Sequence, residues 1–199
     1  KFVIVFYYLL HFLISTIGTY LLSKTFKFSN IASFSAAIFY AFSTKMLLHF
    51  SAGHITMVAA FSFFPLTFLF LRNLLSQSKF RDVVLLSFSL SFTLITYPTI
   101  FYYSIIFVLI YFIYDQFIAN KITKPISIFN KLKPILLSLF ICFLLSAIFL
   151  LPQIEFAKFS NRTSIQLADV ALPIWNIKRF LLSLLFPYPI IRDLDNESF

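Results

Sequence analysis

The sequence predicts an all-α fold, a polytopic transmembrane helical bundle of about six spans, on three observations. Of its 199 residues, 60% are apolar and only 12% are charged, about half the charged fraction of a soluble domain. The apolar residues form long uncharged runs, separated by short basic clusters, as in multi-pass membrane proteins. There are only two glycines, which excludes collagen, a glycine-rich phosphate loop and a Rossmann fingerprint.

The net charge of +9 raises the question of a nucleic-acid partner. A nucleic-acid reader carries its basic residues on one water-exposed face. Here the basic residues stand mainly in the connections between apolar runs, as membrane topology requires. We therefore expect membrane lipid as a partner and no nucleic acid.

The first half of the chain predicts three spans, at residues 2–22, 31–42 and 55–75. His11 lies within the first span, and we expect its imidazole to bond to a neighbouring helix. The link at residues 46–54 is expected to lie on the membrane surface or to re-enter the membrane, and Gly53 favours a tight backbone bend within it. Pro65 should kink the third span, because it cannot donate the usual helical hydrogen bond.

The second half predicts spans at residues 83–96, 99–114 and 135–151. The first two form an antiparallel hairpin across the Tyr97-Pro98 turn. A basic, water-exposed loop occupies residues 115–134. Residues 1–152 thus form the bundle, and residues 153–199 form an extracytoplasmic segment. Its residues 176–186 have one apolar face, as an amphipathic helix in the membrane interface has.

Loop charge predicts the orientation, because lysine and arginine concentrate on the cytoplasmic side. One set of connections holds Lys24, Lys27, Arg72, Lys79, Arg81, Lys121, Lys124, Lys131 and Lys133, whereas the other holds only Lys45. The first set is therefore expected in the cytoplasm, where lipid headgroups account for it. This places the start of the sequence and all residues after Pro152 on the outer side of the membrane. We expect that membrane to be the cell membrane.

Polar groups collect on the predicted outer face, where we look for a binding site: Lys45, His49, His54, Tyr97, Gln153, Glu155, Lys158 and Arg162. No metal is expected, because the spacing of His49 and His54 does not stack them on a helix and no carboxylate or cysteine lies nearby. The sequence contains no Ser-His-Asp pattern, no paired catalytic carboxylates and no phosphate loop, and we expect no organic cofactor. A divalent cation is compatible with the chemistry but not indicated. Cys142 is expected to be a buried thiol.

Several short motifs follow one another in a characteristic order along nearly the whole chain: Gly18-x-Tyr20-Leu-Leu, Phe39-Tyr40-Ala41-Phe42-Ser43, Gly53-His54, Pro65-Leu66, Tyr97-Pro98, Leu150-Leu151-Pro152-Gln-Ile-Glu155, Ser160-Asn-Arg162 and Leu181-Leu-Ser-Leu-Leu-Phe-Pro187-Tyr188. This order resembles the YfhO-type membrane proteins of bacteria and archaea, in the GT-C superfamily of polytopic glycosyltransferases. The resemblance implies an enzyme that transfers a sugar from a polyprenyl-phosphate-linked donor to an extracytoplasmic acceptor. It also implies an acidic catalytic residue in an outer loop upstream of Lys1, so that the catalytic residues are expected outside the sequence and this piece is inactive alone.

The predicted substrate-binding residues are His54, Glu155, Arg162, Lys45 and Tyr97. Arg162 can hold a phosphate through a bidentate fork, and Lys45 can act as a point charge. His54 can position an acceptor hydroxyl or donate to the phosphate. The structural alternatives are that Arg162 only pairs with Glu155 and that His54 only caps the span at residues 55–75.

Two other functions remain open. The first is a non-catalytic transporter, flippase or polymerase-type component that handles lipid-linked saccharides. Apart from His11, the spans hold no ionisable residue at mid-depth, which counts against an ion-coupled transporter. The second is a purely structural membrane subunit, for which the outer loops should be mobile and without a cavity.

Overall fold

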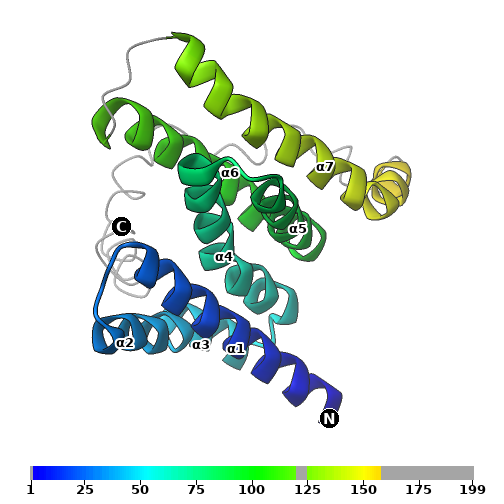
Figure 1. The fold of residues 1–199 in the computed structure, drawn as a ribbon. Coiled ribbons are helices and arrows are strands. Elements are labelled where there is room, and N and C mark those ends of the chain that lie inside the picture. Colours follow the sequence, from blue (N-terminus) through cyan, green and yellow to red (C-terminus); the bar gives the residue numbers. More distant parts are fainter. Residues whose placement is uncertain (1, 120–124, 158–199) are drawn as a thin grey trace, which may run out of the picture. The chain divides into compact units, whose positions relative to one another are not determined.

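The computed structural model describes residues 2–119 and 125–157, and all regular structure within these ranges is helical (Figure 1). The elements are α1 (Phe2–Thr25), α2 (Asn30–Ala41), α3 (Thr44–Ser51), α4 (Ile55–Gln77), α5 (Phe80–Thr96), α6 (Pro98–Ile113), the π-helical turn η1 (Tyr114–Ala119) and α7 (Pro125–Ala157). The chain divides into two compact units, Lys1–Pro152 and Gln153–Phe199. Only residues 153–157 of the second unit are described, so the amphipathic helix expected at residues 176–186 lies outside the described residues.

The fold class is confirmed, since five helical stretches of the described chain are long and apolar enough to cross a membrane. They are Phe2–Thr25, Asn30–Ser51, Ile55–Gln77, Pro98–Ile118 and Ile128–Phe156. The expected span at residues 83–96 corresponds to α5, which has 17 residues and a length of about 25 Å at 1.5 Å per residue. This is shorter than a typical hydrocarbon core of about 30 Å. The described chain therefore has the helices of a multi-pass membrane protein.

Helix α4 is the central element of the first unit, because it packs against α1, α3, α5 and α6 (Figure 1). The approach of α1 depends on Gly18, where an added Cβ would lie 3.0 Å from Cγ of Leu66. Nδ1 of His11 and Oγ of Ser62 also pair at 2.8 Å between the two helices. The expected bond from His11 to a neighbouring helix is thus confirmed.

A hydrophobic core, which we call the second core to separate it from the contact between α1 and α4, lies among α4, α5, α6 and α7. It is built on fully buried Leu71, Leu86 and Leu90. Hydroxyl pairs cross this core where two helices meet. Thr67 and Ser89 are 2.7 Å apart between α4 and α5. In lipid, apolar contacts alone give little specificity to helix packing, so hydrogen bonds such as this one help to hold two helices together.

The structure differs from the prediction of a basic, water-exposed loop at residues 115–134. Residues 114–119 form η1, and α7 begins at Pro125, a residue that suits the first turn of a helix because it has no N–H to satisfy. Ile128 and Leu132 then pack against the second core. The apolar spacing of residues 125–134 therefore outweighs Lys131 and Lys133, which charge alone assigned to water.

Candidate functional site

Three basic side chains meet beside α3, namely Lys45, His49 and His54, which we call the histidine cluster. The imidazole rings of His49 and His54 meet edge to face, with 5.5 Å between their centroids. The ring of His49 stacks on the ring of Phe61 in α4, with 5.8 Å between the centroids. Nζ of Lys45 lies 6.0 Å from the centroid of the Phe61 ring. Phe61 therefore serves as the apolar floor on which the cluster is assembled.

The turn after α3 explains why the two histidines meet. His54 N–H donates to the carbonyl of His49 at 2.9 Å, and Gly53 N–H donates to the carbonyl of Phe50 at 3.1 Å. These two bonds define a Schellman motif, in which a residue of positive φ follows the helix. Gly53 is this residue, with a φ of 73°, which confirms the bend expected there. The motif brings the side chains at the positions of His49 and His54 into contact.

The cluster combines one buried and two exposed groups. His49 is 9% exposed, and its Nε2 has no hydrogen-bond partner within the described part of the chain. Lys45 and His54 are exposed. Although His54 stands at the N-cap of α4, its side chain makes no capping hydrogen bond, so the capping alternative is not what the structure shows. A buried ring nitrogen without a partner costs free energy, which a polar ligand or water would recover.

An apolar groove of about 250 Å³ lies on the other face of α3, between α1 and the end of α2. It is lined by Val5, Tyr8, Leu9, Phe12, Phe42, Leu47 and Phe50. At about 100° per residue, Leu47 lies about 160° around the helix from both Lys45 and His49. Phe50 lies about 140° from Lys45 and about 100° from His49. The eight residues of α3 thus present a cationic face to the histidine cluster and an apolar face to the groove.

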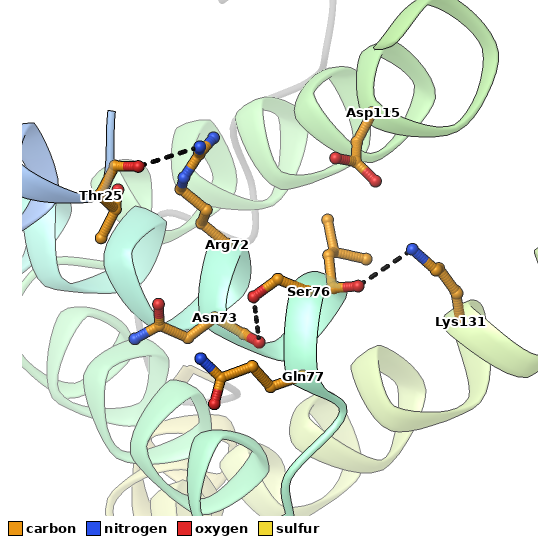
Figure 2. A pocket seen from close by; sticks show the side chains of 8 residues that line it. Thr25, Arg72, Asn73, Ser76, Gln77, Asp115 and Lys131 are labelled. Atoms are coloured by element: carbon orange, nitrogen blue, oxygen red, sulfur yellow. Dashed lines mark hydrogen bonds between the residues drawn. The ribbon is translucent and has the colours of Figure 1, made fainter. Parts of the chain in front are cut away.

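A polar pocket of about 530 Å³ lies at the opposite ends of the helices, and we call it the basic pocket (Figure 2). Its lining residues are Thr25, Arg72, Asn73, Leu75, Ser76, Gln77, Asp115 and Lys131. Nη2 of Arg72 donates to the carbonyl of Thr25 at 3.1 Å, and Nζ of Lys131 donates to the carbonyl of Leu75 at 3.0 Å. The end of α1, the end of α4 and the beginning of α7 are therefore joined here.

The predicted site residues fall into three groups. Lys45 and His54 are brought together, with His49 as a third member that the sequence placed on the same face but not in the site. Tyr97 is half-buried at the junction of α5 and α6, and within the described residues it forms no hydrogen bond or ring contact with the cluster. Glu155 is exposed and belongs to the second unit. Arg162 lies outside the described residues.

The basic pocket was not predicted from the sequence, because loop charge alone assigned the lysines and arginines at that end to topology. One signal was present: Arg72 stands five residues before the end of its helix, inside an apolar run, rather than in the connection that follows. Metal binding has no support in the described ranges, where no three His, Cys, Asp or Glu side chains group together.

Comparisons of the chain with protein-family models, with curated proteins and with solved structures found no match in any of the three.

Proposed function

We propose that this chain is the membrane part of a multi-pass glycosyltransferase of the GT-C type, similar to the YfhO-type proteins. It takes its sugar from a polyprenyl-phosphate-linked donor and passes it to an extracytoplasmic acceptor. In this proposal the basic pocket faces the cytoplasm and the histidine cluster faces outward, because lysine and arginine concentrate in cytoplasmic connections. The membrane is the cell membrane.

One observation carries the proposal: α3 separates a cationic cluster from an apolar groove. A polyprenyl-phosphate donor has the same two parts, an anionic phosphate at the membrane surface and a hydrocarbon chain below it. Lys45 and His54 supply exposed cationic or donor groups, and the partnerless Nε2 of His49 supplies a buried one. The groove beside Leu47 and Phe50 accepts the first isoprene units.

Within this scheme the residues bind and orient the donor. A phosphate between Lys45 and His54 gains charge-assisted hydrogen bonds, which are shorter and stronger than neutral ones. Phe61 excludes water from one side of the site and thereby strengthens the electrostatic attraction. Tyr97, Glu155 and Arg162 are proposed to contact the sugar or the phosphate from other segments. The acid that activates the acceptor is proposed to come from an outer loop.

The proposal is tested by titrating the purified chain in detergent with polyprenyl phosphate and measuring its affinity. Lys45→Gln and His49→Gln should each weaken binding about tenfold, the equivalent of about 1.4 kcal/mol for a lost charge-assisted contact. Lys79→Gln is the matched control, because Lys79 is exposed at the other ends of the helices. Equal weakening by Lys45→Gln and Lys79→Gln would reduce the effect to net charge and contradict the proposal.

The groove is tested separately with a bulky residue on α1. Leu9→Trp should fill the groove and weaken binding of polyprenyl phosphate, whereas Leu13→Trp should not. Leu13 is exposed to a similar extent, 55% against 62% for Leu9, but it does not line the groove. If both variants bind the long-chain phosphate as the unmodified chain does, the groove is not the site of the hydrocarbon chain.

A further inference from the structure

The basic pocket has no role in the proposed glycosyl transfer, which takes place at the other ends of the helices. Its largest charged group, Arg72, is held rigidly. Nη1 donates to the hydroxyl of Tyr111 at 2.9 Å, Nη2 donates to the carbonyl of Thr25, and Cζ lies 4.1 Å from the ring centroid of Phe26. These two hydrogen bonds use two of the five N–H groups of a guanidinium. The remaining donors belong to a group whose position is already fixed.

Lys131 enters the pocket from another element and is fixed in the same way. Its Nζ donates to the carbonyl of Leu75, which uses one of three N–H donors of the ammonium group. Figure 2 shows Arg72, Asp115 and Lys131 reaching the pocket from α4, η1 and α7. Among the described residues that line it, two cationic groups and one carboxylate give a formal charge of plus one around a space of about 530 Å³.

The backbone that supplies Asp115 is unusual. Residues 114–119 are π-helical, a conformation that is rare and is found frequently at functional sites. The neighbouring Gln116 is fully buried and donates to Oδ2 of Asp115 at 2.7 Å. The carboxylate is thereby oriented by an adjacent side chain, so that the third wall of the pocket is also pre-organised.

The location of the pocket favours a lipid over a soluble ligand. It lies where the membrane-length stretches Phe2–Thr25 and Ile55–Gln77 end, which is the level of the lipid headgroups. The elements that carry Asp115 and Lys131 also expose large apolar side chains nearby, Phe117, Ile118 and Phe129. A ligand with a headgroup in the pocket can therefore lay its acyl chains on these side chains.

We propose that the basic pocket binds a phosphate ester, supplied by the headgroup of an anionic phospholipid. The phosphodiester of a lipid such as phosphatidylglycerol carries one negative charge, which matches the formal charge of the pocket. It lies between Arg72 and Lys131, where it accepts hydrogen bonds from the guanidinium and the ammonium group. A headgroup of zero net charge leaves the positive charge of the pocket uncompensated. The same physics governs anionic lipids in basic pockets between membrane helices.

The test compares two lysines on the same helix. The whole chain is purified in neutral detergent and titrated with phosphatidylglycerol or phosphatidylcholine, and the bound lipid is counted by native mass spectrometry. Lys131→Gln should weaken phosphatidylglycerol binding about tenfold. Lys133→Gln should change it less than about twofold, because Lys133 is exposed and lies over the ring of Phe129 at 4.8 Å instead of in the pocket. The unmodified chain should prefer phosphatidylglycerol to phosphatidylcholine by about tenfold.

A second variant separates binding from folding. Arg72→Lys keeps the charge but loses the planar fork, so it should weaken phosphatidylglycerol binding. The thermal unfolding of the lipid-free variant is measured in parallel. Equal effects of Lys131→Gln and Lys133→Gln, or equal binding of the two lipids, would overturn the proposal.

Inorganic phosphate distinguishes the two sources of the phosphate group. It should displace phosphatidylglycerol only at millimolar concentration, because it lacks the acyl chains. If it binds more tightly than phosphatidylglycerol does, the lipid source is wrong. Neither result depends on polyprenyl phosphate binding at the histidine cluster, so this inference and the proposed function stand or fall separately.

Discussion

The hydroxyl of Tyr40 donates a hydrogen bond to the backbone carbonyl of Phe61 at 2.8 Å. In an α-helix that carbonyl accepts from the N–H four residues later, but the residue four later in α4 is Pro65, which has no N–H. Helix α2 therefore supplies the donor that α4 lacks. The bond satisfies a carbonyl in an apolar environment, and it fastens α2 to the segment of α4 that also carries the floor of the histidine cluster.

This relationship predicts a dependence between the two positions. Tyr40→Phe should lower the free energy of unfolding by about 0.6–2 kcal/mol, because the carbonyl of Phe61 loses its partner. In a Pro65→Ala background the restored N–H can bond to the same carbonyl, so Tyr40→Phe should cost less. Thermal unfolding in detergent of the four proteins of this cycle measures the coupling. Tyr20→Phe is the control, because the Tyr20 hydroxyl has no hydrogen bond in the described structure. An equal cost of Tyr40→Phe in both backgrounds would show that Pro65 is not the reason for the bond.

The two glycines of the chain should respond to substitution for different physical reasons. At Gly18 the backbone is helical, and an added methyl group would lie 3.0 Å from Cγ of Leu66. Gly18→Ala should therefore destabilise by about 1–3 kcal/mol through overpacking, and Leu66→Ala should relieve part of that cost. At Gly53 nothing lies within 4 Å of the added Cβ, but φ is 73°. Gly53→Asn should then be tolerated better than Gly53→Val, because Asn adopts the left-handed conformation more readily. Thermal unfolding of these variants decides, and a Gly53→Val protein as stable as Gly53→Asn would contradict the conformational argument.

Helix α7 should depend on a stripe of small side chains. Ser138, Cys142 and Ser146 follow one another at intervals of four and are all fully buried. Ser138 donates to the carbonyl of Val83 at 3.2 Å, and Oγ of Ser146 lies 2.9 Å from that of Ser91. Cys142→Leu should destabilise the chain by about 1–3 kcal/mol, whereas Cys142→Ser should change stability little because its volume is similar.

The buried thiol provides the measurement for this stripe. Cys142 should react with a thiol-specific dye only as the chain unfolds, so the temperature of labelling reports the release of α7. Ser146→Ala should lower that temperature, and Ser146→Leu should lower it more. Rapid labelling of Cys142 in the folded protein at room temperature would show that α7 is not docked on α5 as described.

The sequence supports the fold prediction better than the site prediction. The lengths of the apolar runs and the paucity of charge settle the helical membrane class, because a backbone in lipid has to satisfy its own hydrogen bonds. The element boundaries follow local chemistry, as at Gly53. The exception is residues 125–134, where lysine-rich composition suggested a loop. Long basic side chains can direct their charges to water or to carbonyls while their helix stays packed, and Lys131 does so.

The site was harder to predict, because it depends on contacts between segments far apart in the sequence. His49 and His54 do not share a helical face, and only the Schellman turn brings their rings together. Arg72 and Lys131 are 59 positions apart in the numbering, and no local pattern relates them. A lysine that marks topology and a lysine that lines a pocket have the same sequence context, as Lys131 and Lys133 demonstrate. Packing decides between the two roles.

The proposed function depends on which end of α4 lies in the cytoplasm. Helix α4 separates Ser51, at the end of α3, from Gln77, and its 23 residues extend about 34 Å. Both positions are exposed, so cysteines introduced there should react readily. The nine basic residues that the sequence assigns to one side of the membrane predict that Gln77 lies in the cytoplasm and Ser51 outside.

Single Ser51→Cys and Gln77→Cys variants in a Cys142→Ser background test this orientation in intact cells. A membrane-impermeant maleimide should label the cysteine at position 51 directly, and it should label the cysteine at position 77 only after the membrane is permeabilised. Lys27→Cys provides a second position at the end of α1, with the behaviour expected of position 77. If positions 27 and 77 label directly and position 51 does not, the histidine cluster faces the cytoplasm, and an extracytoplasmic transfer reaction is excluded. If positions 51 and 77 label from the same side, α4 does not cross the membrane, and the assignment of Ile55–Gln77 as a span is wrong.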